Sequence, residues 1–191
     1  MNRILFVCTG NTCRSPMAEG ILRRLAEDHG LQHIEVRSAG VAAYDGAPVS
    51  GHAAAILKEK GFHETLTSSA LTGDQLNWAD VVLTMTSGHK QHTIQRFPLF
   101  VDKIYTLKEF VDDTQAAERI AELEELVAEL HVKRALSQPV TEEESRRLRA
   151  LERELPDYDI ADPFGGSMKL YRQCADEIES SLIKLLGKLK Q

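Results

Sequence analysis

The sequence predicts an α/β fold in which a parallel sheet carries helices on both faces. Apolar segments of strand length alternate with amphipathic segments of helix length along most of the chain. Such alternation is typical of βαβ units, whose crossover helices cover both faces of a sheet. The chain has 191 residues, 42% of them hydrophobic, which is enough for one sizeable core. We therefore expect a single domain over residues 1–191, with one insertion described below.

The elements follow one another in β-α-β order. Uninterrupted apolar runs predict the first and third strands, and strands are expected at residues 3–7, 34–38, 81–85 and 103–105. Helices are expected at residues 17–29, 52–60 and 87–96, and Pro16 suits the first turn of the first of them. Gly61 ends the second helix, and Thr72 with Gln75 forms a capping box that opens a short one. The last helix begins near Ser167 and carries an apolar stripe of Leu170, Cys174, Ile178, Leu182, Leu185 and Leu189.

Residues from about 114 to 156 differ in composition from the rest of the chain, because charged, strongly helix-forming runs replace the alternating pattern. Aliphatic residues recur there at three- and four-residue steps, at Ile120, Leu123, Val127 and Leu130 and again at Leu148, Leu151 and Leu155. The spacing predicts an antiparallel helical hairpin that turns near Ser137-Gln138-Pro139. One interpretation is a lid or docking arm whose apolar stripe contacts a protein partner or a second copy. The other is a solvated decoration, and the sequence leaves both open.

The most informative motif follows the first strand, where the chain reads Cys8-Thr9-Gly10-Asn11-Thr12-Cys13-Arg14-Ser15. If this loop curls, its N–H groups point inward toward an oxyanion, and Arg14 adds a planar bidentate clamp. The same surroundings favour the nucleophilic thiolate of Cys8. Gly10 lets the backbone approach the ligand, Asn11 tolerates a left-handed conformation, and Ser15 can donate its hydroxyl to the thiolate. A ligand in such a sheet belongs at the carboxyl ends of the strands, where Cys8 lies.

Three other interpretations of this loop are less favoured. Cys8 could be a small buried hydrophobe, the loop could be an ordinary turn, or Cys8 and Cys13 could bind zinc. A zinc site needs about four ligands, and no second Cys or His cluster with finger spacing accompanies this pair. The loop also lacks the Gly-Lys-Ser/Thr of a nucleotide-binding P-loop. We therefore expect no metal and no cofactor.

The loop followed by Pro16-Met17-Ala18-Glu19, together with Ser38-Ala39-Gly40 and Asp162-Pro163, resembles the low-molecular-weight protein tyrosine phosphatase family. The resemblance covers roughly residues 1–111 and 156–191. It implies a four-stranded doubly wound sheet, phosphorylated protein substrates and a phosphocysteine intermediate. It also implies that Cys8 is the nucleophile, Arg14 the transition-state clamp, Asp162 the general acid and Ser38 a support of the loop.

Two departures from the family pattern concern the substrate. Thr12 stands where the tyrosine phosphatases typically carry an aliphatic residue, whereas members resembling protein-arginine phosphatases carry threonine. Family members acting on phosphotyrosine commonly show two aromatic residues after Asp-Pro, but here Phe164 is followed by Gly165. The expected function is hydrolysis of phosphoarginine, with phosphotyrosine as the alternative. An arsenate reductase and a phosphate-binding module without catalysis are further alternatives.

Bulk properties agree with an intracellular enzyme. The net charge of −6 disfavours a nucleic-acid partner, and the chain shows neither a signal peptide nor a long apolar run, so we expect no membrane association. Three cysteines, an odd number, indicate the reducing cytoplasm rather than a disulfide framework. Cys13 lies five positions after Cys8, so the two thiols are candidates for a reversible disulfide, whereas Cys174 is read as a core residue.

Overall fold

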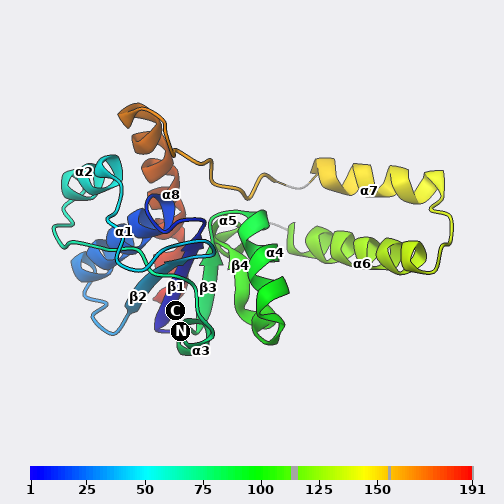
Figure 1. Ribbon diagram of the computed structural model, residues 1–191, viewed down its shortest axis with the longest axis horizontal. Coiled ribbons are helices and arrows are strands. Elements are labelled where there is room, and N and C mark those ends of the chain that lie inside the picture. Colours follow the sequence, from blue (N-terminus) through cyan, green and yellow to red (C-terminus); the bar gives the residue numbers. More distant parts are fainter. Residues whose placement is uncertain (113–115, 155, 191) are drawn as a thin grey trace. The chain divides into compact units, whose positions relative to one another are not determined.

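The structure is a computed structural model that describes residues 1–112, 116–154 and 156–190. The chain divides into two compact units (Figure 1). Met1–Val111 and Tyr158–Gln191 form the first, called here the α/β unit, and Asp112–Asp157 form the second, called the helical unit. Of the described helices, none combines the length and apolar character that crossing a membrane requires. That residues 1–191 make a single domain stays a prediction.

The α/β unit contains a parallel sheet of four strands in the order β2-β1-β3-β4, which confirms the predicted fold class (Figure 1). The strands are β1 (Arg3–Cys8), β2 (Glu35–Gly40), β3 (Val81–Thr84) and β4 (Ile104–Thr106). The register aligns Val7 with Ala39 on one side and with Thr84 on the other. The chain therefore leaves β1 between two neighbouring strands, at the carboxyl edge of the sheet.

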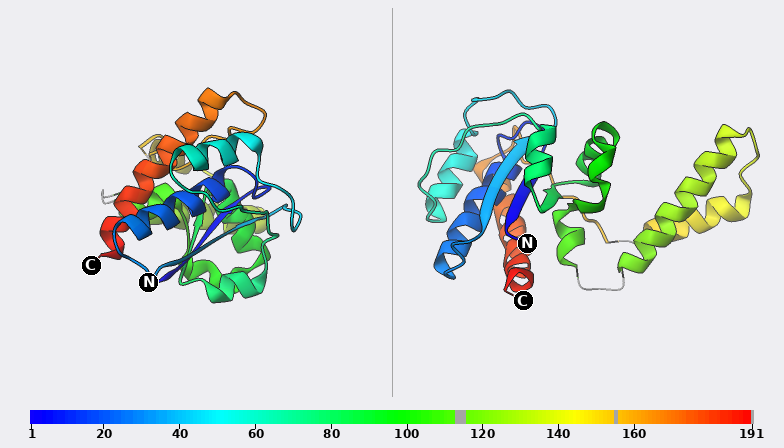
Figure 2. Two further views of the ribbon diagram at one scale, coloured as in Figure 1. Left: turned by 90° about the vertical axis from the view of Figure 1, so that its left-hand side faces the viewer. Right: turned by 90° about the horizontal axis from the view of Figure 1, so that it is seen from below.

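Helices cover both faces of this sheet (Figure 2). They are α1 (Arg14–Asp28), α2 (Gly51–Glu59), α3 (Gly73–Trp78), α4 (Ser87–Arg96), the 3₁₀ helix η1 (Pro98–Lys103), α5 (Leu107–Val111) and α8 (Met168–Leu189). Successive side chains of β1 point to opposite faces, so Ile4 and Phe6 join the core under α1, α2, α5 and α8. Leu5 and Val7 join the core under α3, α4 and η1. Burial on both faces explains why β1 is uninterruptedly apolar.

The predicted elements are present within a few residues of their expected bounds, and the capping box of Thr72 and Gln75 is confirmed. The short elements η1 and α5 were not expected, because five or six residues are too few to show a helical period. The stripe expected on α8 is wrong at Leu170, which is 50% exposed. Tyr171 is 3% exposed and opens the buried face instead, because it lies at the three-residue step before Cys174.

The helical unit is an antiparallel pair formed by α6 (Ala116–Ala135) and α7 (Glu142–Glu154) (Figure 1). Its small core consists of Leu126, Leu130 and Leu151, with Leu123, Val140 and Leu148 partly buried. Val127 of the expected stripe is half-buried and lies outside this core, in which its neighbour Leu126 is buried. Ser137 makes the turn with φ +55°, where it was expected. Thr114 and Leu155 lie outside the described residues.

Candidate active site

The loop after β1 turns its carbonyl oxygens toward the surrounding chain. The carbonyls of Cys8 and Thr9 accept the N–H groups of Val41 and Ala42 at 2.9 Å, and the carbonyl of Thr12 accepts the N–H of Ser50 at 2.9 Å. Among the described residues, the N–H groups of residues 10–13 meet no acceptor. Helix α1 begins directly afterwards and adds the positive end of its dipole. The loop thus offers several N–H donors that an oxyanion can bind.

Asn11 holds this loop in shape. It is fully buried, and its φ of +52° places it in the left-handed region. Its Nδ2 donates to Ser15 Oγ and to Ser38 Oγ, both at 2.8 Å, and its Oδ1 accepts the N–H of Ser69 at 2.7 Å. Ser38 in turn donates to Glu19 Oε2 at 2.5 Å. One amide therefore ties the loop to the start of α1, to β2 and to the segment before α3.

Glu19 completes this network, although the sequence singled it out only as part of a motif. Its side chain is 8% exposed and pairs with Arg23 at 2.6 Å. Burial raises the pKa of Glu19, while the bond from Ser38 and the charge of Arg23 oppose that rise. The signal that could have found it is an acidic residue on the buried face of α1, one turn after Ser15.

The phosphate loop passes close to the end of β2, at Gly40. A Cβ at this position would lie 2.5 Å from the carbonyl oxygen of Thr9 and 2.8 Å from the backbone nitrogen of Asn11. The loop backbone passes so close to β2 that only glycine fits there. The motif Ser38-Ala39-Gly40 is therefore tied to the loop by contact.

Cys8 lies at the base of a pocket of about 230 Å³. Its side chain is buried, and its Sγ lies 3.0 Å from Ser15 Oγ, so this hydroxyl can donate to a thiolate. The pocket is lined by Cys8, Thr9, Gly10, Thr12, Cys13, Arg14, Asp162 and Phe164. Seven of the sequence-predicted site residues thus line it, and Asn11, Ser15 and Ser38 support its loop from behind.

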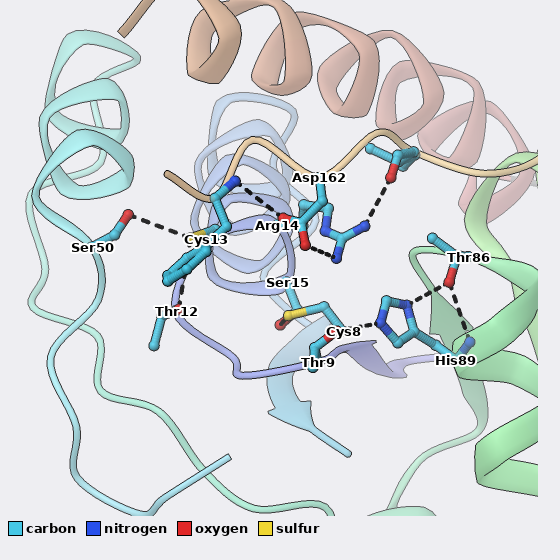
Figure 3. A network of polar contacts seen from close by, with 12 residues as sticks. Cys8, Thr9, Thr12, Cys13, Arg14, Ser15, Ser50, Thr86, His89 and Asp162 are labelled. Atoms are coloured by element: carbon cyan, nitrogen blue, oxygen red, sulfur yellow. Dashed lines mark hydrogen bonds and ion pairs between the residues drawn. The ribbon is translucent and has the colours of Figure 1, made fainter. Parts of the chain in front are cut away.

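Arg14 and Asp162 both line the pocket and form an ion pair there (Figure 3). The guanidinium of Arg14 is 6% exposed and donates through Nη1 to the carbonyl of Ile160 at 2.9 Å. Its Nη2 lies 2.9 Å from Asp162 Oδ2, while the Asp162 side chain is 51% exposed. The arginine is therefore fixed, and its carboxylate partner is the accessible member of the pair.

The segment before Asp162 is fixed to the residue that follows β3. The N–H of Ile160 donates to the carbonyl of Met85 at 2.9 Å, and Ile160 is fully buried. Asp159 accepts the N–H of Ser87 at 2.7 Å and so caps the start of α4. These contacts direct Asp162 to the pocket and commit Asp159 elsewhere. Phe164 is 75% exposed at the rim.

The two remaining cysteines have different surroundings. Cys13 Sγ lies 3.1 Å from Tyr171 Oη and 3.5 Å from Ser50 Oγ, at the wall of the same pocket. All three cysteines are free thiols, so a disulfide between Cys8 and Cys13 stays a prediction. Cys174 is 4% exposed in α8, and its burial raises the pKa of the thiol to about 12. Such a thiol is unsuited to the electron relay of an arsenate reductase.

His89 is a site neighbour to which sequence reasoning gave no role. Its Nε2 lies 2.8 Å from Thr9 Oγ1 and its Nδ1 lies 2.8 Å from Thr86 Oγ1 (Figure 3). Burial, followed by the charge of Arg14, lowers the pKa of His89 to about 4, although Asp162, among others, opposes the shift. The available signal was its place in the first turn after β3, beside the strand that leads to Cys8.

Comparison with known proteins agrees with this geometry. The family described as low molecular weight phosphotyrosine protein phosphatase matches residues 3–125. A protein-arginine-phosphatase of Geobacillus stearothermophilus is 40% identical over 98% of this chain and 96% of its own length. The protein-arginine-phosphatase of Bacillus subtilis is 36% identical over 98% of this chain and 97% of its own length.

A solved structure is similar over nearly the whole chain. It is a YwlE arginine phosphatase mutant with a phosphorylated active-site serine, 35% identical, with a TM-score of 0.73 and coverage of 99% of this chain and 96% of that one. The family match spans more than half of the sequence, and the curated relatives span nearly all of it. The chain therefore belongs to the low molecular weight phosphotyrosine protein phosphatase family and is a cysteine-dependent protein phosphatase.

Proposed function

We propose that this protein removes the phosphoryl group from phosphoarginine in protein substrates, with Cys8 as nucleophile, Arg14 as transition-state clamp and Asp162 as general acid. The observation that carries the reaction type is one pocket that combines a buried thiol, loop N–H groups that meet no acceptor among the described residues, a fixed guanidinium and an accessible carboxylate. The free thiols suit a reducing compartment, so we place the reaction in the cytoplasm.

In the first step, the Cys8 thiolate attacks phosphorus in line with the departing nitrogen. The P–N bond breaks as the S–P bond forms, and the negative charge on the equatorial oxygens is held by the loop N–H groups and Arg14. Asp162 gives its proton to the departing guanidino nitrogen. In the structure, Asp162 Oδ2 lies 2.9 Å from Arg14 Nη2. Before the first step, the phosphoryl group must therefore displace the Asp162 carboxylate from Arg14.

In the second step, water attacks the phosphocysteine. Asp162, now deprotonated, accepts a proton from this water, the S–P bond breaks, and inorganic phosphate leaves. Ser15 Oγ, 3.0 Å from Cys8 Sγ, stabilises the thiolate that returns. A relative with a phosphorylated active-site serine supports a covalent phosphoenzyme at the position of the nucleophile.

Two features support phosphoarginine as the substrate class. Thr12 lines the pocket, and its hydroxyl can orient a polar N–H or a water beside a phosphorylated guanidinium. Phe164 is the single aromatic residue among those lining the pocket, which leaves one ring face for a phenol. The relatives over the full chain that are named protein-arginine-phosphatases point the same way.

The test compares kcat/KM of the reduced protein on a phosphoarginine peptide and on a matched phosphotyrosine peptide, with Cys8→Ser as the blank. We expect a preference for phosphoarginine that falls in Thr12→Ile, because isoleucine keeps the β-branch and removes the hydroxyl. Thr12→Ser is the matched control, since it retains the hydroxyl. A phosphotyrosine preference in the wild type would instead support the alternative substrate.

A further inference from the structure

The contact between His89 and Thr9 links α4 to the phosphate loop. Because β3 pairs with β1, helix α4 begins beside the end of β1. His89 lies in the first turn of α4 and is 8% exposed, while Thr9 is exposed and lines the pocket next to Cys8. The imidazole ring contacts the loop at the Thr9 hydroxyl, beside Cys8 (Figure 3).

One arrangement of the protons in this chain of contacts pairs every group within the described residues. Thr86 Oγ1 accepts the backbone N–H of His89 at 3.2 Å, so its own proton is free to go to Nδ1 of the ring, 2.8 Å away. The neutral ring then carries its proton on Nε2 and donates it to Thr9 Oγ1. In the opposite tautomer, the Thr86 proton would have no acceptor within the described part of the chain.

This arrangement decides what Thr9 offers to the pocket. Since Thr9 Oγ1 accepts from the ring, its own O–H is left to donate. Thr9 lines the pocket together with Cys8 and Arg14, so this O–H can donate to a ligand bound there. A donor fixed in advance at this wall stabilises negative charge that develops on a phosphoryl oxygen.

We propose that His89 is a positioning residue that fixes the Thr9 hydroxyl as a hydrogen-bond donor to an oxygen of the transferring phosphoryl group. The inference adds a side-chain donor to the loop N–H groups and Arg14, and it rests on the proposed phosphatase mechanism. It does not depend on the substrate class, because the phosphoryl group is common to all substrates.

The experiment compares two substitutions at position 89, glutamine and asparagine, whose side-chain amides differ in length. The Nε2 of a glutamine lies near the place of the ring Nε2, so His89→Gln keeps a donor to Thr9. The shorter His89→Asn reaches Thr86 and not Thr9. We expect His89→Asn to lower kcat/KM about tenfold and His89→Gln to stay within about threefold of the wild type, given what a bond to a charged group contributes. His92→Asn, an exposed imidazole on the same helix, is the matched control.

Thr9 variants close a double-mutant cycle. We expect Thr9→Val to lose about tenfold or more in kcat/KM, Thr9→Ser to retain activity, and His89→Asn to cost nothing further in the Thr9→Val background. A purely structural role of His89 predicts that the two losses multiply and that His89→Asn, which keeps the contact to Thr86, is the milder change. Multiplying losses, a milder His89→Asn, or an unchanged kcat/KM of Thr9→Val would each overturn the proposal.

Both a phosphoarginine peptide and 4-nitrophenyl phosphate are assayed, so the two proposals fail separately. If the protein turns over only the aryl phosphate and the effects of the His89 and Thr9 variants are coupled, this inference holds and the phosphoarginine assignment fails. If the protein turns over phosphoarginine and the effects of the two variants are independent, the phosphoarginine assignment holds and this inference fails. Titration of inorganic phosphate by calorimetry gives a readout independent of turnover, in which Thr9→Val weakens binding and Thr9→Ser does not. Equal binding by both variants would contradict the donor role. Thermal unfolding checks that each variant folds.

Discussion

Replacing Asn11 by alanine tests whether one buried amide holds the phosphate loop. The change removes three hydrogen bonds, of 2.8, 2.8 and 2.7 Å, that join Asn11 to Ser15, Ser38 and Ser69. Each contributes about 0.5–1.5 kcal/mol net. Alanine at a φ of +52° adds about 1 kcal/mol of strain that asparagine tolerates better. We therefore expect the free energy of unfolding to fall by about 4 kcal/mol.

The assay is urea denaturation followed by tryptophan fluorescence. Trp78 is the one tryptophan in the sequence and lies in α3, so its signal reports the α/β unit alone. A loss of about 4 kcal/mol corresponds to a melting temperature lower by about 8–16 °C for a chain of this size. We expect kcat/KM to fall as well, because the loop N–H groups lose their fixed direction.

Asn11→Gly separates the two contributions. Glycine adopts the left-handed conformation without strain but makes none of the side-chain bonds. We therefore expect this variant to be destabilised by about 3 kcal/mol, less than the alanine variant. Asn11→Ala within about 0.5 kcal/mol of the wild type would refute the reasoning, because the network would then contribute nothing measurable. Equal losses in the two variants would refute the strain argument alone.

Three further predictions concern the acid, the buried histidine and the helical unit. Asp162→Ala should lower kcat by about 10²–10⁴-fold, because the general acid is lost. Inhibition by inorganic phosphate should not weaken, since the carboxylate that competes for Arg14 is gone. Unchanged turnover would exclude Asp162 as the acid. The pKa of His89 is about 4 in the folded protein and near 6.5 in the unfolded chain. Between these two pH values the unfolded chain binds more protons, so the free energy of unfolding falls as the pH drops from 6.5 to 4. The loss, measured by urea denaturation at each pH, is at most about 3 kcal/mol, and His89→Gln should flatten this part of the curve of stability against pH. Equal slopes in wild type and variant would contradict the assignment of this pH dependence to His89. Leu151→Ala should destabilise the helical unit by about 2–3 kcal/mol in hydrogen exchange. A concurrent change in kcat/KM on a phosphorylated protein would favour a lid or docking arm, and an unchanged value a solvated decoration.

Local chemistry made much of the fold predictable. The apolar run in β1, the capping residue Thr72 and the left-handed tolerance of Asn11 are properties of neighbouring residues, and the structure places all three as expected. Leu170 was placed wrongly, and Leu126 rather than Val127 joins the core of the helical unit, because a stripe at steps of three and four admits two neighbouring faces. Which face is buried depends on the opposing element, and the sequence of one helix does not contain that element.

The sequence by itself determined the order of the elements, the phosphate loop and the identity of its thiol and guanidinium, because these lie within eight consecutive residues. Only the tertiary structure decided which distant groups meet this loop. Glu19 reaches it through Ser38, Asp162 through the anchoring of Ile160 on Met85, and His89 through the pairing of β3 with β1. The physical reason is that strand order brings residues about 80 and 150 positions apart to one sheet edge, and no local period along the chain encodes that order.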